Sequence, residues 1–388
     1  MSTPAPAWMN EDLRIFQSSV RRIFENEFVP RESRWLAQGY PDREVWRELG
    51  RLGLLCAGIP EQYGGAGGGF GHEAVICQEQ FRAQLNSFSL NVHSNIVGHY
   101  LLNYGSEEQR QHWLPSMASG DTVAAIAMSE PGAGSDLQAV RTTAVADGDD
   151  YVINGAKTFI TNGYHAELIC VVAKTDRQAK GSRGISLILV DTREVEGFRR
   201  GRLLKKIGQR GQDTAELFFD NVRVPRRQLL GGEEGRGFAQ LMEQLPRERL
   251  LIAIGAAAAM RRAIDETLEY VNQRQVFGQR LLEMQNTRFK LAEAHTQATV
   301  ADCFIDRCIQ GVIDGTLDVP TAAMAKWWTT QLHCQVVDEC LQLHGGYGYM
   351  EEYPISRMYT DARVGKVYGG ANEIMKEVIA RDLERRFN

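Results

Sequence analysis

Apolar residues recur at helical spacing through the first third of the chain. Leu13, Phe16, Val20 and Ile23 are separated by three or four residues, and later apolar positions keep a similar rhythm. This spacing places apolar side chains along one face of an α-helix. Polar and charged residues fill the positions between them. We therefore predict a helical region over residues 10–122.

The pattern changes after Asp121 to short apolar or alternating runs, which Gly, Asp, Asn and Pro separate. Runs of this length and composition are typical of strands. The runs are Thr122–Met128, Asp150–Ile153, Leu168–Ala173, Ile185–Val190 and Ala215–Phe219. Since no long helical pattern lies between them, we predict an antiparallel β domain rather than a Rossmann unit.

Helical spacing returns beyond Gly232 and continues to the end of the chain. The segments with this spacing are Phe238–Met242, Leu250–Tyr270, Leu281–Ile313, Val319–Leu343 and Met375–Leu383. A chain of 388 residues is long enough for two or three domains. We predict an α+β multidomain fold with a helical domain at 1–122, a β domain at 123–232 and a second helical domain at 233–388.

Composition narrows the class of protein. The chain is 43% hydrophobic and 24% charged, as ordinary globular proteins are, and its net charge of −5 argues against a binder of nucleic acid or anionic membranes. The longest apolar run, Leu250–Met260, is too short to span a bilayer, and we expect no leader peptide. The seven cysteines form no CxxC pair. We therefore expect reduced thiols, no metal site and a cytoplasmic, bacterial protein.

Two glycine pairs near the end of the chain punctuate its helical pattern. Gly345 and Gly346 follow an apolar helical run, and Gly369 and Gly370 precede a predicted last helix at Glu373–Arg385. Glycine leaves backbone N–H groups unshielded, and a helix N-terminus favours an anion. Spacing alone equally allows two helix stops and a tight loop.

Two runs in the predicted β domain could face a flat ligand. Ala127–Asp136 leaves a strand and enters a turn of small residues, where backbone N–H groups can approach a planar molecule. In Lys157–Gly163, strand alternation would place Phe159 and Thr161 on one face, so that the aromatic ring stacks on a ligand beside a hydroxyl. The alternatives are a surface turn and a half-buried edge strand with Phe159 in the core.

Two further runs contain charged residues of possible function. Arg274 begins the run RQVFG, and arginine is a good ligand for pyrophosphate because its fork is planar and always charged. The alternative is a solvated helix face. Glu248 lies in the run LPRERL, where a helix that starts at Pro246 would explain an acidic first turn by capping alone.

Taken in order along the chain, these runs resemble the acyl-CoA dehydrogenase family, and most closely its long-chain and isovaleryl members. The matching runs are AMSEPGAGSD, KTFITNG, GQRGQDT, RQVFG, QLHGGYGY and VYGGANEI. The resemblance implies three domains, the last one a four-helix bundle, and a non-covalently bound FAD. The helical 10–122 region is similar to the family as well.

The resemblance also implies roles for individual residues. For FAD these are Met128, Ser129, Phe159, Thr161, Arg274, Phe277, Gln285, Gln342, Gly345, Gly346, Ala371 and Glu373. Of these residues, six would reach the FAD of a neighbouring subunit, namely Arg274, Phe277, Gln285, Gln342, Gly345 and Gly346. Ala371 stands where threonine is common, which removes one phosphate contact. Ser135, Arg249 and Tyr368 match residues that lie near the substrate.

Gly369 stands where most of the family carries its catalytic glutamate. Desaturation of a thioester needs a base for the α-proton and an acceptor for the β-hydride, which in this family is N5 of FAD. The long-chain and isovaleryl members place the base on an earlier helix, at the position of Glu248. We therefore expect Glu248 to be the base and the Gly369 N–H to hold the thioester oxygen. Glu373 is the rival base.

The function that the resemblance implies is oxidation of an acyl-CoA to the trans-2-enoyl-CoA in fatty-acid β-oxidation or branched-acyl catabolism. It also implies a homotetramer, built as a dimer of dimers, that passes electrons to an electron-transfer flavoprotein. An acyl-CoA oxidase or nitroalkane-oxidase-like flavoenzyme is one alternative. A non-catalytic helical binding protein that contains FAD is another. The sequence leaves acyl length and branching open.

Overall fold

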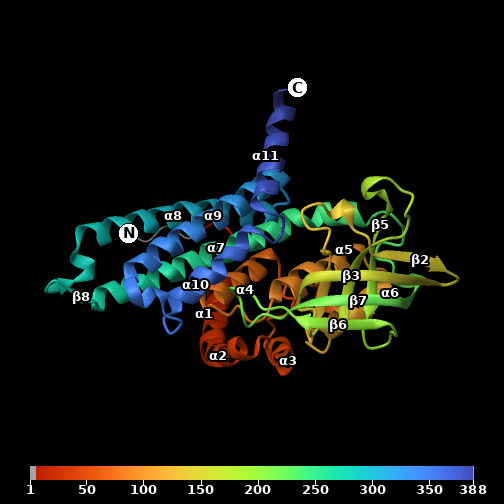
Figure 1. The fold of residues 1–388 in the computed structure, drawn as a ribbon, viewed down its shortest axis with the longest axis horizontal. Helices are drawn as coiled ribbons and strands as arrows, with labels where there is room; N and C mark the ends of the chain where they lie inside the picture. The colour runs from red at the N-terminus through yellow and green to blue at the C-terminus, as the bar shows by residue number, and fades with distance from the viewer. Residues whose placement is uncertain (1–5, 388) are drawn as a thin grey trace.

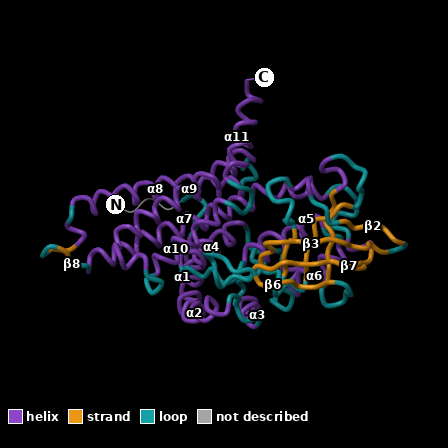
Figure 2. Tube along the Cα trace, viewed as in Figure 1, coloured by secondary structure: helices purple, strands orange, loops and turns teal. Residues whose placement is uncertain are grey.

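The computed structural model describes residues 6–387, so the outermost residues of the two predicted helical domains lie outside the described range. Long C-terminal helices form one end of the molecule, and a twisted sheet with N-terminal helices beside it forms the other (Figures 1 and 2). The N-terminal helical region is confirmed. It contains α1 (Glu11–Ile23), α2 (Val29–Gln38), α3 (Glu44–Arg51), α4 (Phe70–Arg82), α5 (Gly98–Tyr104) and α6 (Glu107–Ala118), with π-helical turns at Phe24–Phe28 and Asn91–Val97.

The middle region is a seven-stranded sheet. Its strands are β1 (Ala124–Ala127), β2 (Thr143–Asp147), β3 (Asp150–Thr161), β4 (Leu168–Lys174), β5 (Ile185–Asp191), β6 (Phe198–Leu203) and β7 (Thr214–Pro225). The order is β1-β4-β2-β3-β7-β6, and β5 pairs with β4. The sheet is mainly antiparallel, as expected of the β domain: four of its six ladders are antiparallel, and only β1 and β2 run parallel to β4.

The sequence pattern missed β2 and β6 for a physical reason. The outer half of β2 is exposed, and β6 is an arginine-rich edge strand in which no residue is fully buried. Neither strand therefore shows the apolar run or the regular alternation by which strands are recognised.

The C-terminal region is built on long helices. They are α7 (Gly237–Gln273), α8 (Gln285–Ile313), α9 (Val319–His344), α10 (Pro354–Ala362) and α11 (Asn372–Phe387), with a small hairpin of β8 (Gln275–Val276) and β9 (Gln279–Arg280) between α7 and α8. Helices α7 to α10 pack together as the four-helix bundle that was expected. The two helical segments predicted at 238–242 and 250–270 are one helix, since α7 runs unbroken through Pro246.

Helix α7 joins the three parts of the molecule. Its first turns pack against β5, its middle packs against α4 and α5, and its remaining length packs against α8 and α9. In Figure 1 it runs from the helical bundle toward the sheet. A side chain in the first half of α7 can therefore be buried where sheet, bundle and N-terminal helices meet.

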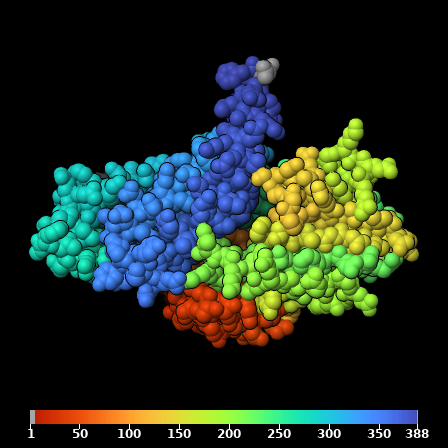
Figure 3. Space-filling model, viewed as in Figure 1, coloured from red at the N-terminus to blue at the C-terminus, as the bar shows by residue number. Residues whose placement is uncertain are grey.

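Helix α11 behaves differently from the other helices. It leaves the body of the molecule and projects outward (Figures 1 and 3), and only Asn372 and Met375 of its sixteen residues are buried. Near its free end Leu383 and Phe387 are exposed. Within residues 6–387 no helix is both long and apolar enough to cross a membrane.

Candidate active site

Glu248 is a buried carboxylate on α7, with only 6% of its surface exposed. The hydroxyl of Tyr100, on α5, donates a hydrogen bond of 2.9 Å to Glu248 Oε1. Burial raises the pKa of Glu248 to about 7, although Tyr100 and the charges of Arg249 and Arg247 oppose the shift. The alternative of a solvated glutamate in a first helical turn is wrong, because α7 begins eleven residues earlier, at Gly237.

A carboxylate with this pKa can accept a proton near neutral pH. Tyr100 stays protonated there, because burial and the neighbouring Glu248 raise its pKa well above 10. Tyr100 also belongs to a buried apolar cluster with Cys170, and Met128 packs against that cluster. Glu248 and the turn that was predicted to face a flat ligand therefore border the same buried cluster.

The hydrogen bond from Tyr100 gives a first prediction. Tyr100→Phe removes the donor that stabilises the carboxylate, so the pKa of Glu248 should rise further. If Glu248 acts as a base, the rate of substrate-dependent flavin reduction in the parent should increase with pH through about 7. In the variant this increase should occur at higher pH, with a similar plateau. Stopped-flow flavin reduction between pH 6 and 9 measures both curves, and coincident profiles would contradict the prediction.

The Gly369–Gly370 turn lies beside Arg249 of α7. Both glycines have left-handed backbones, with φ of 65° and 93°, which disfavours any side chain there. Arg249 Nε donates to the Gly369 carbonyl over 3.3 Å. A Cβ on Gly369 would overlap Cδ1 of Ile252, which is one helical turn beyond Glu248. The turn and the Glu248 stretch of α7 are therefore direct neighbours.

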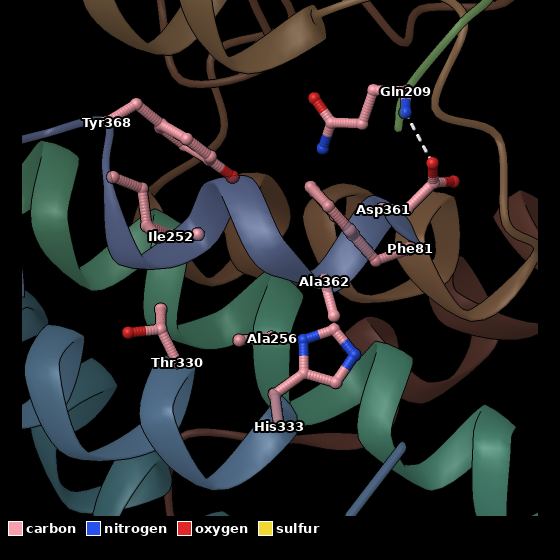
Figure 4. A pocket seen from close by; sticks show the side chains of 10 residues that line it. Phe81, Gln209, Ile252, Ala256, Thr330, His333, Asp361, Ala362 and Tyr368 are labelled. Atoms are coloured by element: carbon pink, nitrogen blue, oxygen red, sulfur yellow. Dashed lines mark hydrogen bonds between the residues drawn. The ribbon is translucent and has the colours of Figure 1, made fainter. Parts of the chain in front are cut away.

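Tyr368, the residue before this turn, lines a cavity of about 20 Å³ together with Ile252 (Figure 4). On the far side of the cavity, the Asp361 carboxylate accepts a hydrogen bond from the Gln209 backbone. Gln209 belongs to the run GQRGQDT of the β domain, to which we assigned no chemistry. The contact explains that run as a link that holds the β domain against α10.

The turn after β1 and the end of β3 are held together by hydrogen bonds. The backbone N–H of Thr158 donates a hydrogen bond of 2.9 Å to the carbonyl of Ser129. The ammonium of Lys157 donates to the Met128 carbonyl over 3.0 Å and to the Glu130 carboxylate over 2.9 Å. Lys157 and Glu130 are buried. Sequence reasoning assigned nothing to this ion pair, although both residues lie inside the two runs that it singled out.

Phe159 has an unusual conformation for an aromatic residue. Its φ is 60° and its side chain is 68% exposed. A bulge between Lys157 and Ile160 interrupts the pairing of β3 with β7, so simple alternation alone does not place Phe159 and Thr161 on one face, and their shared face stays a prediction. The alternative of a core phenylalanine on an edge strand is wrong, since β3 lies between β2 and β7. A strained, exposed aromatic is typical of a ligand site and fits a flat ring system.

A second group of predicted residues gathers at the far end of the bundle. Arg274 follows the last residue of α7 and lies over the ring of Tyr347, 5.4 Å from its centre. Phe277, at the tip of the β8–β9 hairpin, is 97% exposed. Gln285 starts α8, Gln342 is exposed near the end of α9, and Gly345 and Gly346 follow that helix. Arg274 is thus not part of a helix face.

The two groups do not meet within one chain. Glu248 and Arg274 are separated by about 40 Å along α7 at about 1.5 Å per residue. In Figure 1 the hairpin is at the end of the bundle opposite to the sheet. A single FAD cannot span that distance, so the geometry agrees with a site that two chains share.

The remaining predicted residues lie at the edges of the site. Ser135 is exposed in the turn after β1, and Tyr368 is 37% exposed. Ala371 is half-buried before α11, and Glu373 is exposed in its first turn. Glu248 therefore differs from its rival Glu373 in being buried against a tyrosine hydroxyl.

Three models of the acyl-CoA dehydrogenase family match consecutive parts of the chain: the N-terminal domain at residues 10–121, the middle domain at 125–222 and the C-terminal domain at 235–384. The long-chain specific acyl-CoA dehydrogenase of Sus scrofa, a mitochondrial protein, is 48% identical over 95% of this chain and 86% of its own. A crystal structure of an acyl-CoA dehydrogenase from Geobacillus kaustophilus has a TM-score of 0.95 and 46% identity, over 98% of this chain and 100% of that one.

A glutaryl-CoA dehydrogenase from Mycobacterium smegmatis, solved in complex with FADH2, aligns with a TM-score of 0.90 and 28% identity, over 97% of this chain and 95% of its own. The chain belongs to the acyl-CoA dehydrogenase family. It is an FAD-dependent oxidoreductase, as the resemblance implied.

Proposed function

We propose that Glu248 is the base that removes the α-proton of an acyl-CoA thioester. Together with loss of a hydride from Cβ, this converts the acyl-CoA to the trans-2-enoyl-CoA. The observation that supports this most strongly is the burial of Glu248, which raises its pKa to about 7 beside a turn with no side chain at position 369. Bound FAD supplies the acceptor for the hydride that leaves Cβ. Glu248 keeps the proton until it is released to solvent.

The Gly369 N–H should hold the thioester oxygen while negative charge develops on it. The side chain of this residue is absent, but its N–H remains, and Arg249 fixes the adjoining carbonyl. One preorganised donor of this kind is worth about 3 kcal/mol in the transition state. Ser135, Arg249 and Tyr368 would contact or orient the substrate, and Met128, Ser129, Phe159, Thr161, Ala371 and Glu373 would face the cofactor of the same chain.

The reaction class has a direct test. An acyl-CoA added under argon should bleach the flavin absorbance of the purified protein, while a binding protein that merely contains FAD would show no bleaching. In air, peroxide formation at the rate of substrate turnover would identify an oxidase instead. We expect little peroxide, with turnover supported by an electron-transfer flavoprotein as the physiological acceptor.

The substrate prediction follows from the position of the base. With glycine at 369, no side chain occupies the turn beside the reacting carbons, so we expect long or methyl-branched acyl groups to be accepted. Long straight chains are slightly favoured, and the similarity to a long-chain relative supports this. A panel from C4 to C16 with isovaleryl-CoA, assayed with an artificial electron acceptor, measures kcat/KM. Strong preference for butyryl-CoA would contradict the prediction.

We also propose a homotetramer, built as a dimer of dimers, in which the hairpin end of one chain covers the FAD of another. The separation of the two residue groups supports this, as do the exposed Phe277 and the projecting α11 with its exposed Leu383 and Phe387. We place the domains at 1–122, 123–232 and 233–388. All seven cysteines are free thiols, which supports a reducing compartment such as the bacterial cytoplasm.

Loss of Arg274 should weaken cofactor binding. Arg274→Ala removes the cation proposed to pair with the FAD diphosphate, so the purified variant should retain less FAD per subunit while its circular dichroism is unchanged. Arg307→Ala, on an exposed part of α8, is the control. Measuring flavin absorbance against protein, with sedimentation for oligomeric state, tests the prediction. A yellow Arg274→Ala protein with full FAD content, or a monomeric parent, would contradict it.

A further inference from the structure

Lys326, on α9, is a fully buried lysine at the Gly369–Gly370 turn. None of its surface is exposed. Its ammonium donates to the Gly370 carbonyl over 2.6 Å and to Asn372 Oδ1 over 2.9 Å. Thr330 donates to the same Asn372 oxygen over 3.2 Å. Lysine is rarely buried without a carboxylate partner, so this one calls for an explanation.

Within residues 6–387 no carboxylate oxygen lies within 4 Å of the Lys326 ammonium, whose partners are neutral oxygens. Another cation lies nearby, since the Arg249 charge acts on Lys326 in the same direction as burial. Together they lower the pKa of Lys326 to about 8, and the charge of Glu373 opposes the shift. Burial of an uncompensated charge destabilises a fold, which makes a purely structural role for the lysine costly.

Two cations from two helices thus hold consecutive carbonyls of one turn. Arg249 of α7 binds the carbonyl of Gly369, and Lys326 of α9 binds that of Gly370. The two glycines are left-handed, so side chains of their own do not fix the turn. The orientation of the Gly369 N–H therefore depends on what its neighbouring carbonyls bind.

We propose that Lys326 is a positioning residue for the oxidation of the acyl-CoA: it fixes the Gly369–Gly370 turn and supplies a buried positive charge that favours the anionic, enolate-like form of the thioester. This rests on the proposed function of Glu248 and Gly369. Lys326 acts through the turn and does not touch the substrate. Its charge matters because buried electrostatic interactions are weakly screened.

Removal of the α-proton moves a negative charge from Glu248 to the thioester while the two cations at the turn stay in place. Ionised Glu248 balances one of the two cations before the reaction. When Glu248 accepts the α-proton it becomes neutral, and the negative charge moves to the thioester, with its oxygen at the Gly369 N–H. Among residues 6–387 no carboxylate forms an ion pair with Lys326 or Arg249, so these two cations then favour the charged state of the thioester over the neutral one.

The test separates binding of an anionic ligand from binding of a neutral one. A 3-oxoacyl-CoA can bind as its enolate because its α-carbon is acidic, whereas a trans-2-enoyl-CoA of the same length cannot. In the FAD-containing Lys326→Met variant, affinity for the 3-oxoacyl-CoA should fall at least about tenfold, while affinity for the enoyl-CoA changes less than about threefold. Flavin reduction by a saturating acyl-CoA should slow at least about tenfold.

Lys326→Gln keeps hydrogen-bond donors but lacks the charge. If the Lys326→Met variant fails to retain FAD, the affinities of Lys326→Gln for the 3-oxoacyl-CoA and the enoyl-CoA test the proposal instead. Thr329→Val is the matched control, because Thr329 is buried on the same helix and its hydroxyl has no partner among the described residues. Equal weakening of both ligands, or unchanged enolate affinity, would overturn the proposal. If the parent protein binds both ligands but its flavin is not reduced by acyl-CoA, that result would instead contradict the proposed function and leave the affinity test intact.

Discussion

Glu248→Gln should slow anaerobic flavin reduction by acyl-CoA at least about 100-fold, the lower end of what a positioned general base contributes. Glutamine has the same shape and can still accept the hydrogen bond from Tyr100, but it cannot take up a proton at neutral pH. FAD content and acyl-CoA affinity should therefore stay near those of the parent. Stopped-flow absorbance of the flavin measures the rate, and titration of the oxidised variant measures the affinity.

The same helix offers a matched control. Glu243 accepts a hydrogen bond of 2.7 Å from Tyr104, as Glu248 does from Tyr100, but Glu243 is exposed. Glu243→Gln should leave flavin reduction unchanged. Near-normal reduction by the Glu248→Gln variant would place the base elsewhere, and Glu373 would be the next residue to replace.

Stability distinguishes a lost base from a damaged fold. Burial raises the pKa of Glu248 from 4.5 to about 7, so the folded state binds its proton more tightly than the unfolded state does. The resulting stabilisation is complete below about pH 4.5 and is lost as the pH rises through about 7. Glutamine never ionises. The melting temperature of Glu248→Gln should consequently equal or exceed that of the parent at pH 8.

Moving the carboxylate back to the position that most of the family uses should recover activity substantially only when room is made for it. Glu248→Gly with Gly369→Glu supplies the new base, but a Cβ at position 369 overlaps Ile252 Cδ1 and the backbone there is left-handed. The sequence alone predicts partial rescue by this double change. The structure adds that Ile252→Ala is needed for substantial rescue.

We expect the triple variant to reduce its flavin at least about tenfold faster than Glu248→Gly alone, and the double variant to gain less. Ile252→Ala combined with Glu248→Gly, with Gly369 retained, is the control and should gain nothing. A double variant as fast as the triple one would show that Ile252 moves aside freely. If the control recovered the rate, the rescue could not be assigned to the new carboxylate.

The order of helices, strands and helices was predictable because each region has a clear apolar period. The joint occurrence of a glutamate at position 248 and a glycine at position 369 could also be interpreted from the sequence, since both residues lie in runs that resemble the family. The partner of Glu248 was not, because Tyr100 lies 148 residues away and nothing in its own run marks it. Lys326 escaped notice for the same reason: it follows the short run Thr321–Ala325 near the start of α9, which marks no site, and only the fold brings it to the turn.

Local backbone geometry limited the remaining predictions. The bulge in β3 that leaves Phe159 exposed depends on pairing with β7, which local alternation does not contain. Pro246 suggested a helix start, yet α7 continues through it because packing on both sides holds the helix. In both cases tertiary contacts outweighed a local preference.

Removal of the α-proton can be measured without the oxidation that follows it. If the flavin is first reduced with dithionite, the hydride cannot leave Cβ, but the base can still exchange the α-hydrogens of a long straight-chain acyl-CoA with D2O. Mass spectrometry at pH 8 should show exchange by the parent and at least about 100-fold slower exchange by Glu248→Gln. Exchange by Glu248→Gln at the rate of the parent would contradict the assignment of Glu248 as the base.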